Sequence, residues 1–210
     1  MKVACLGNGP YYLYPDPTPV ATPGLRRQDG SPCRTVRGIA LCRCGGSSNK
    51  PFCDGTHTRN GFSDRNAADP ERNRRVAYAG KAITIFDNRA ICAHAGFCTD
   101  GLKNVFRMKA EPWIDPDGAA VAEVIATIEK CPSGALSYAK SGVEGTSPAR
   151  EPMLTVMNDG PYAVTGGVEL AAVEFGDGAS REHYTLCRCG GSKNKPFCDG
   201  THWRIGFKDP

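Results

Sequence analysis

The sequence predicts an α+β fold in which two small β-rich domains flank a middle α+β domain. One reason is a repeat: Leu41 to His57 recurs at Leu186 to His202, and the two copies differ only where Ser48 stands opposite Lys193. The other is a series of short apolar runs separated by glycine and proline, which is typical of short strands. Because a unit of roughly 60 residues buries only about 60 % of its unfolded surface, we expect the outer units to pack together as an intramolecular pseudo-two-fold pair. The predicted domains are residues 1–70, 74–141 and 151–210.

The outer domains carry most of the short apolar runs, and the middle domain carries a helical pattern. Val76 to Phe86 is apolar and partly alternating, which predicts a strand. Within Ala119 to Lys130, apolar residues recur at positions i, i+3, i+4 and i+7, which predicts a helix that packs one face on a core and ends before Pro132. That face consists of Val121, Val124, Ile125 and Ile128. Further strands are expected at Tyr11 to Leu13, Val36 to Cys42, Met153 to Met157, Tyr162 to Val164, Val168 to Phe175 and His183 to Cys187.

Composition excludes several classes of function. The chain has 210 residues and a net charge of +4, and its 26 basic and 22 acidic residues show no basic cluster in the sequence, so we expect no nucleic-acid partner. There is no membrane-spanning apolar run of about 18 residues and no signal-peptide pattern, so we expect a cytoplasmic protein without a membrane partner. In that reducing compartment the 11 cysteines are expected to bind metal rather than form disulfides. No nucleophile–base pattern, P-loop or dinucleotide fingerprint is present, which disfavours an autonomous enzyme.

Each repeat contains the spacing C-x-C-x8-C-x3-H, which supplies three thiolates and one imidazole. The eight candidate ligands are Cys42, Cys44, Cys53 and His57 in the first copy and Cys187, Cys189, Cys198 and His202 in the second. Three Cys and one His suit either zinc or an iron–sulfur cluster. Zinc sites usually pair their cysteines as C-x2-C, so the C-x-C spacing favours iron–sulfur.

Both segments resemble the CDGSH iron–sulfur domain of mitoNEET-type proteins, whose pattern is C-x-C-x2-[S/T]-x3-P-x-C-D-G-[S/A/T]-H. Ser47, Pro51 and Cys53 to His57 fill the fixed positions of the first copy, and Ser192, Pro196 and Cys198 to His202 fill those of the second. The resemblance implies a 2Fe-2S cluster held by three Cys and one His in each domain, in a β-rich fold completed by two protomers or by tandem domains. We therefore expect a monomer that contains its own pseudo-dimer.

A neutral imidazole in place of one thiolate makes the cluster less negative and easier to reduce. The reduction potentials of these clusters are expected to lie above those of plant-type ferredoxins, which are about −400 mV. They are expected to lie toward or below the potentials of Rieske centres. Because imidazole binds a metal only through an unprotonated nitrogen, acid should weaken the bond. His57 and His202 are therefore predicted to make both clusters acid-labile and transferable.

The middle domain contains an incomplete ferredoxin pattern. Cys92 and Cys98 occupy the first and third positions of C-x2-C-x2-C, Ala95 occupies the second, and Cys131 precedes a proline. Three sulfurs fit a 3Fe-4S cluster, and His94 could complete a 4Fe-4S site. The stretch from residue 78 to 136 resembles the divergent single-cluster ferredoxin-like domain that is known beside CDGSH segments. The alternative is a degenerate domain whose three cysteines are reduced thiols and which serves as a spacer or docking surface.

The remaining candidates are less specific. Cys5 and Cys33 have no metal spacing and are expected to be free thiols, and His183 is not expected to be a ligand because Gly38 fills the matching position. Lys50 and Lys195 are expected to be solvated, with attraction of an anionic partner as the alternative. We expect the chain to carry single electrons to a redox partner protein. The alternatives are storage of clusters or their transfer to an apo iron–sulfur acceptor, and a zinc-stabilised interaction module.

Overall fold

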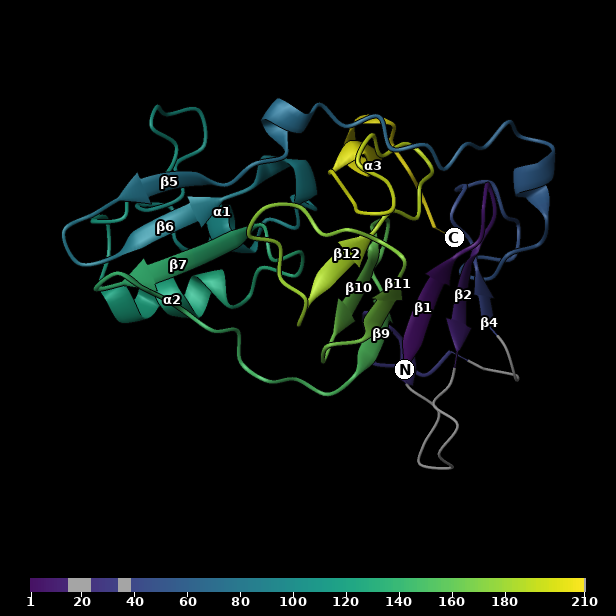
Figure 1. Ribbon diagram of the computed structural model, residues 1–210, viewed down its shortest axis with the longest axis horizontal. Coiled ribbons are helices and arrows are strands. Elements are labelled where there is room, and N and C mark those ends of the chain that lie inside the picture. The colour runs from purple at the N-terminus through teal and green to yellow at the C-terminus, as the bar shows by residue number, and fades with distance from the viewer. Residues whose placement is uncertain (15–23, 34–38, 210) are drawn as a thin grey trace.

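The computed structural model describes residues 1–14, 24–33 and 39–209, which form three four-stranded sheets and several short helices (Figure 1). The first sheet has the order β11 (Glu169–Ala171), β1 (Lys2–Cys5), β2 (Tyr11–Tyr14) and β4 (Ile39–Leu41). The second has the order β12 (Tyr184–Leu186), β10 (Tyr162–Thr165), β9 (Met153–Val156) and β3 (Gly24–Arg27). The third contains β5 (Val76–Ala79), β6 (Thr84–Asp87), β7 (Leu136–Lys140) and β8 (Val143–Glu144).

The helices are short. The α-helices are α1 (Phe97–Gly101), α2 (Val121–Ile128) and α3 (Thr201–Arg204). The 3-10 helices are η1 (Thr56–Thr58), η2 (Pro70–Arg72) and η3 (Arg89–Ile91). Among the helices of the described ranges, none is long and apolar enough to cross a bilayer. The protein is therefore a mostly-sheet α+β structure, as the sequence predicts.

The first and second sheets exchange edge strands. β11, from the C-terminal part of the chain, runs parallel to β1, with Leu170 opposite Val3. β3, from the N-terminal part, runs parallel to β9, with Leu25 opposite Leu154. The apolar faces of both sheets form one core, in which these four side chains are buried. Neither part can therefore complete its sheet or its core without the other.

Most of the strands expected in these two parts are present. The runs that begin at Tyr11, Met153, Tyr162, Val168 and His183 contain β2, β9, β10, β11 and β12. Of the strand expected at Val36 to Cys42, residues 39–41 form β4, and residues 36–38 lie outside the described residues.

The middle part has a core of its own, and one prediction for it is wrong. The expected strand from Val76 to Phe86 is a hairpin of β5 and β6, because the chain turns where the Gly80 N–H donates to the Ile83 carbonyl over 2.9 Å. The expected helix is present as α2. It buries Val124 and Ile128 in this second core, and the half-buried Val121 and Ile125 pack against the same cluster.

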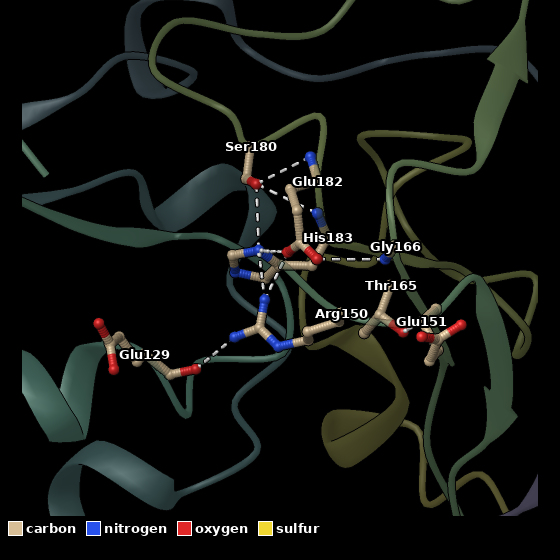
Figure 2. A network of polar contacts seen from close by, with 8 residues as sticks. All are labelled: Glu129, Arg150, Glu151, Thr165, Gly166, Ser180, Glu182 and His183. Atoms are coloured by element: carbon tan, nitrogen blue, oxygen red, sulfur yellow. Dashed lines mark hydrogen bonds and ion pairs between the residues drawn. The ribbon is translucent and has the colours of Figure 1, made fainter. Parts of the chain in front are cut away.

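A polar network joins the end of α2 to the second sheet (Figure 2). The Arg150 guanidinium donates to the Glu129 carbonyl over 2.8 Å and forms an ion pair with Glu182. The His183 Nδ1 lies 2.9 Å from the same carboxylate and 3.1 Å from Ser180 Oγ. Burial lowers the pKa of His183, and the neighbouring Arg150 cation lowers it further. His183 thus belongs to this junction and not to a cysteine loop.

Candidate metal centres

The N-terminal candidate ligands fall into two pairs. Cys42 and Cys44 follow β4, and their sulfurs are 3.9 Å apart. Cys53 and His57 bracket the start of η1, and the Cys53 Sγ lies 3.3 Å from the His57 Nδ1. The turn between them is fixed by Asp54, whose carboxylate accepts hydrogen bonds from the backbone N–H groups of Ser48 and Thr56.

The C-terminal candidate ligands repeat this arrangement. The Cys187 and Cys189 sulfurs are 3.8 Å apart, and the Cys198 Sγ lies 3.4 Å from the Nδ1 of His202 in α3. Asp199 accepts hydrogen bonds from two backbone N–H groups of this loop, in the same way as Asp54.

The distance within each pair is close to that expected for two donor atoms bound to the same metal ion. Two thiolates bound to one tetrahedral ion at about 2.3 Å lie about 3.8 Å apart, and a thiolate and an imidazole on one ion lie about 3.6 Å apart. Across the described ranges of the chain, no three or more His, Cys, Asp or Glu side chains are close enough to hold a single ion. The two donor pairs of each loop therefore fit a cluster of two metal ions.

Backbone N–H groups also point at the sulfurs. Gly46 and Gly55 donate to Cys44 Sγ and Cys53 Sγ over 3.4 Å. Gly191 and Gly200 do the same for Cys189 and Cys198. Such donors stabilise the negative charge of metal-bound thiolates and tune the potential of a cluster.

Each loop is supported by a tyrosine from the other end of the chain. The buried Tyr11 hydroxyl donates to the carbonyls of Cys187 and Pro196, each over 2.9 Å. The buried Tyr162 hydroxyl donates to the carbonyls of Cys42 over 2.8 Å and Pro51 over 2.9 Å. Burial raises the pKa of both tyrosines, so both hydroxyls remain protonated donors. Gly-Pro-Tyr occurs at residues 9–11 and again at residues 160–162, so the repeat could have indicated this pair, although not that the contacts cross.

The two loops also meet directly. Cys44 and Cys189 form an antiparallel backbone bridge. A Cβ on Gly45 would lie 2.5 Å from the Cys189 carbonyl oxygen, and one on Gly190 would lie 2.5 Å from that of Cys44. Only glycine allows this approach at both positions, where φ is +77° and +76°.

The two lysines beside the loops are only partly solvated, which differs from the expectation of solvated side chains. Lys50 and Lys195 are half-buried, and each ammonium donates to a serine carbonyl of its own loop, over 2.8 and 2.6 Å. Lys50 lies over the ring of Phe207, and Lys195 lies over the ring of Phe62. Each side chain therefore holds its own loop and contacts the other segment.

The two sites differ in exposure. Cys198 and His202 are buried, at 2 % and 5 % exposed, whereas their counterparts Cys53 and His57 are half-buried. Cys42 and Cys187 are both buried. Burial raises the pKa of Cys198 well above its ordinary value. A buried thiolate is unfavourable unless a cation binds it, so this side chain is suited to metal.

The three middle-domain cysteines line one cavity of about 300 Å³. Cys92 follows η3, Cys98 lies in α1 and Cys131 follows α2. His94 lines the same cavity, and its backbone N–H donates to Cys92 Sγ over 3.4 Å. Burial raises the pKa of Cys92 to about 12, which again suits a thiolate that a metal stabilises. Ala95, at the vacant ligand position, also lines this cavity.

His94 further connects the middle site to the C-terminal loop. Its backbone has a φ of +53°, and its imidazole packs so closely on Gly200 that a Cβ there would overlap the ring. The middle site therefore lies against the C-terminal CDGTH segment, which the sequence does not indicate. Cys5 and Cys33 take no part in these sites, and none of the cysteines forms a disulfide in the described residues.

Comparison with known proteins agrees with this geometry. The family described as "Iron-binding zinc finger CDGSH type" matches residues 8–58 and 159–203. The chain belongs to the CDGSH iron–sulfur family. A second family, described as "Divergent 4Fe-4S mono-cluster", matches residues 78–141 of this CDGSH protein, between the two CDGSH segments. Both resemblances expected from the sequence are thus confirmed.

Curated relatives cover a smaller part of the CDGSH protein. "Uncharacterized protein YjdI" of Escherichia coli K12 and its counterpart in Escherichia coli O157:H7 are both 48 % identical to it over 61 residues. This match covers 29 % of the chain and 80 % of each relative. No solved structure matches the chain.

Proposed function

We propose that this CDGSH protein is an electron carrier with a 2Fe-2S cluster in each outer loop and a third cluster in the middle domain. The observation that carries the proposal is the pairing of the ligands: in each loop two donor pairs have the spacing for one iron apiece. When bound, such clusters accept and release single electrons.

The residues of these sites would have three roles. In the outer loops, Cys42, Cys44, Cys53 and His57 and their C-terminal counterparts hold the irons. The backbone donors of Gly46 and Gly55 lower the cost of negative charge on sulfur. The middle cavity would hold a 3Fe-4S cluster, with one iron bound by each of Cys92, Cys98 and Cys131. If the cluster is 4Fe-4S instead, His94 would bind the fourth iron.

We also propose that the outer segments form a pseudo-two-fold pair within one monomer, with domains at 1–70, 74–141 and 151–210. Three reciprocal contacts support this: the exchange of β3 and β11, the crossed hydrogen bonds of Tyr11 and Tyr162, and the bridge between Cys44 and Cys189.

A second role is favoured by the exposure of the N-terminal site. Because Cys53 and His57 are half-buried, a cluster there is more accessible to an apo iron–sulfur acceptor than one in the buried C-terminal site. Donation would then draw on the N-terminal site, while the C-terminal site retains its cluster.

Anaerobic reduction with dithionite followed by reoxidation tests the carrier role. We expect the visible absorption to bleach and return in full over several cycles without loss of iron. Irreversible bleaching, with transfer of iron and sulfide to an added apo-ferredoxin, would contradict the carrier role and favour donation.

A further inference from the structure

The two CDGSH segments serve as internal controls for each other, and two of their differences, Lys193 and Trp203, line cavities that the middle domain also lines. After the ligand His57 the N-terminal copy continues with Thr58, Arg59 and Asn60, and after His202 the C-terminal copy continues with Trp203, Arg204 and Ile205. Within the 17 residues of the motif itself, the single difference is Ser48 against Lys193. The C-terminal copy thus gains a tryptophan, an isoleucine and a cation.

The gained tryptophan is exposed above the middle site. Trp203 is 67 % exposed and lines the cavity that contains Cys92, Cys98 and Cys131. Its ring also lies 5.8 Å from that of His202, so it borders the C-terminal site as well. In Figure 1, α3, which carries both residues, lies next to the middle domain.

Two further apolar side chains gather at the same cavity. Phe97 is 45 % exposed and Met108 is 71 % exposed, and both line it together with Trp203. The three residues come from three separate segments of the chain. Large apolar side chains that remain exposed together usually mark an interface, and tryptophan and methionine are among the residues that interfaces enrich.

A basic surface adjoins this apolar group. A neighbouring cavity of about 410 Å³ is lined by Arg72, Arg89, Lys193 and Arg204, against the two carboxylates Asp69 and Asp199. Arg89 lines both cavities, so the basic and apolar surfaces are continuous. One carboxylate, Asp69, lies 3.7 Å from Arg72, and the other accepts two backbone hydrogen bonds in its own loop. Arg89 also lies 3.7 Å from the buried Asp87 carboxylate. Four cations against three carboxylates leave the surface with an excess of positive charge.

We infer that Trp203, Met108 and Phe97, with the basic rim of Arg89, Lys193 and Arg204, form the docking face for an acidic one-electron carrier protein. This inference rests on the proposed electron-carrier function, whose partner it specifies. Opposite charge accelerates encounter and orients the partner, and the apolar centre excludes water once the partner is seated. A partner on this face lies over the middle site and beside the C-terminal site, whereas the polar N-terminal copy of the same loop offers no such face.

Isothermal titration calorimetry with the 210-residue protein tests the docking face. The probes are an acidic flavodoxin and an acidic plant-type ferredoxin, with the basic cytochrome c as the charge control. We expect both acidic carriers to bind, with an affinity that falls as salt rises from about 0.05 to about 0.3 M, and cytochrome c not to bind.

The variants exploit the internal repeat. Lys193→Ser/Trp203→Thr/Ile205→Asn gives the C-terminal loop the residues that the N-terminal loop carries, so the replacements suit the loop conformation. It should raise the Kd at least about tenfold, and Met108→Ser, in a different and exposed segment, should also raise it. The matched control, Thr58→Ala/Asn60→Ala in the N-terminal loop, should leave the Kd within about twofold.

Equal affinities of the triple variant and the control overturn the inference. So does a wild-type protein that binds neither acidic carrier, or that binds a DNA oligonucleotide in their place. Iron and sulfide are measured in every sample, so a failure of the cluster assignment is recognised separately from a failure of the docking face.

Discussion

Replacing Tyr11 by Phe should weaken the C-terminal metal site and spare the N-terminal one, although Tyr11 belongs to the N-terminal segment. The buried hydroxyl donates to the carbonyls of Cys187 and Pro196, so Tyr11→Phe removes both hydrogen bonds at once. The Pro196 carbonyl keeps the hydrogen bond from the Cys187 N–H at 2.8 Å, and the loss falls mainly on the Cys187 carbonyl. A lost buried hydrogen bond of this kind costs about 1–2 kcal/mol, which is roughly a 5- to 30-fold change in the equilibrium that opens the loop.

The assay needs a background in which the signals of the two outer sites are separated. In a Cys44→Ser/Cys53→Ser protein, the reduced 2Fe-2S signal in electron paramagnetic resonance comes from the C-terminal site alone. There Tyr11→Phe should accelerate loss of the signal by roughly 5- to 30-fold, and Tyr162→Phe should change it little. A larger effect of Tyr162→Phe, or equal effects of the two substitutions, would refute the crossed support.

Three other predictions follow from the same structure. Burial raises the pKa of Asp87 to about 6, above its ordinary 3.8. The contribution of the protonated carboxyl to stability is therefore complete below pH 3.8 and is lost as the pH rises through about 6. In chemical denaturation, the stability advantage of Asp87→Asn over wild type should grow by about 1 kcal/mol between pH 5 and pH 8, and a pH-independent difference would contradict this. Arg150→Ala removes the hydrogen bond to Glu129 and should lower hydrogen-exchange protection at residues 121–131 but not at residues 39–57; equal loss in both stretches would show that the junction is not local. Changing His57 and His202 to Cys adds a thiolate to each site and should lower the reduction potentials and slow bleaching in acid; unchanged bleaching kinetics would rule out imidazole as the acid-sensitive ligand.

The repeat and the ligand spacings predicted much of the fold and of the sites, because both are local in sequence. The strands at Tyr11, Met153 and Tyr162 follow from apolar residues bounded by glycine and proline. The prediction of a single strand from Val76 to Phe86 is wrong, because the chain turns at Gly80 and forms a hairpin. β3, at Gly24–Arg27, carries only one buried apolar residue, so periodicity could not identify it as a strand or indicate its pairing with β9.

The remaining features depend on contacts between distant segments. Spacing predicts that Cys42 and Cys187 are candidate ligands, but not that a tyrosine from the opposite end of the chain bonds to the carbonyl of each. The position of His94 against Gly200 depends on how the middle domain packs on the C-terminal loop. The same packing gives Trp203 its place above the middle cavity. A pattern within one segment carries no information on such packing.

The central claim is that one chain holds clusters at three sites, and metal and sulfide analysis of anaerobically purified protein tests it most directly. Paired with electron paramagnetic resonance before and after dithionite, it should find a red protein with about seven irons and an oxidised signal if the middle cluster is 3Fe-4S, or about eight irons if it is 4Fe-4S. About four irons would leave the middle cavity without a cluster and contradict the third site. A colourless protein with stoichiometric zinc would contradict the whole account.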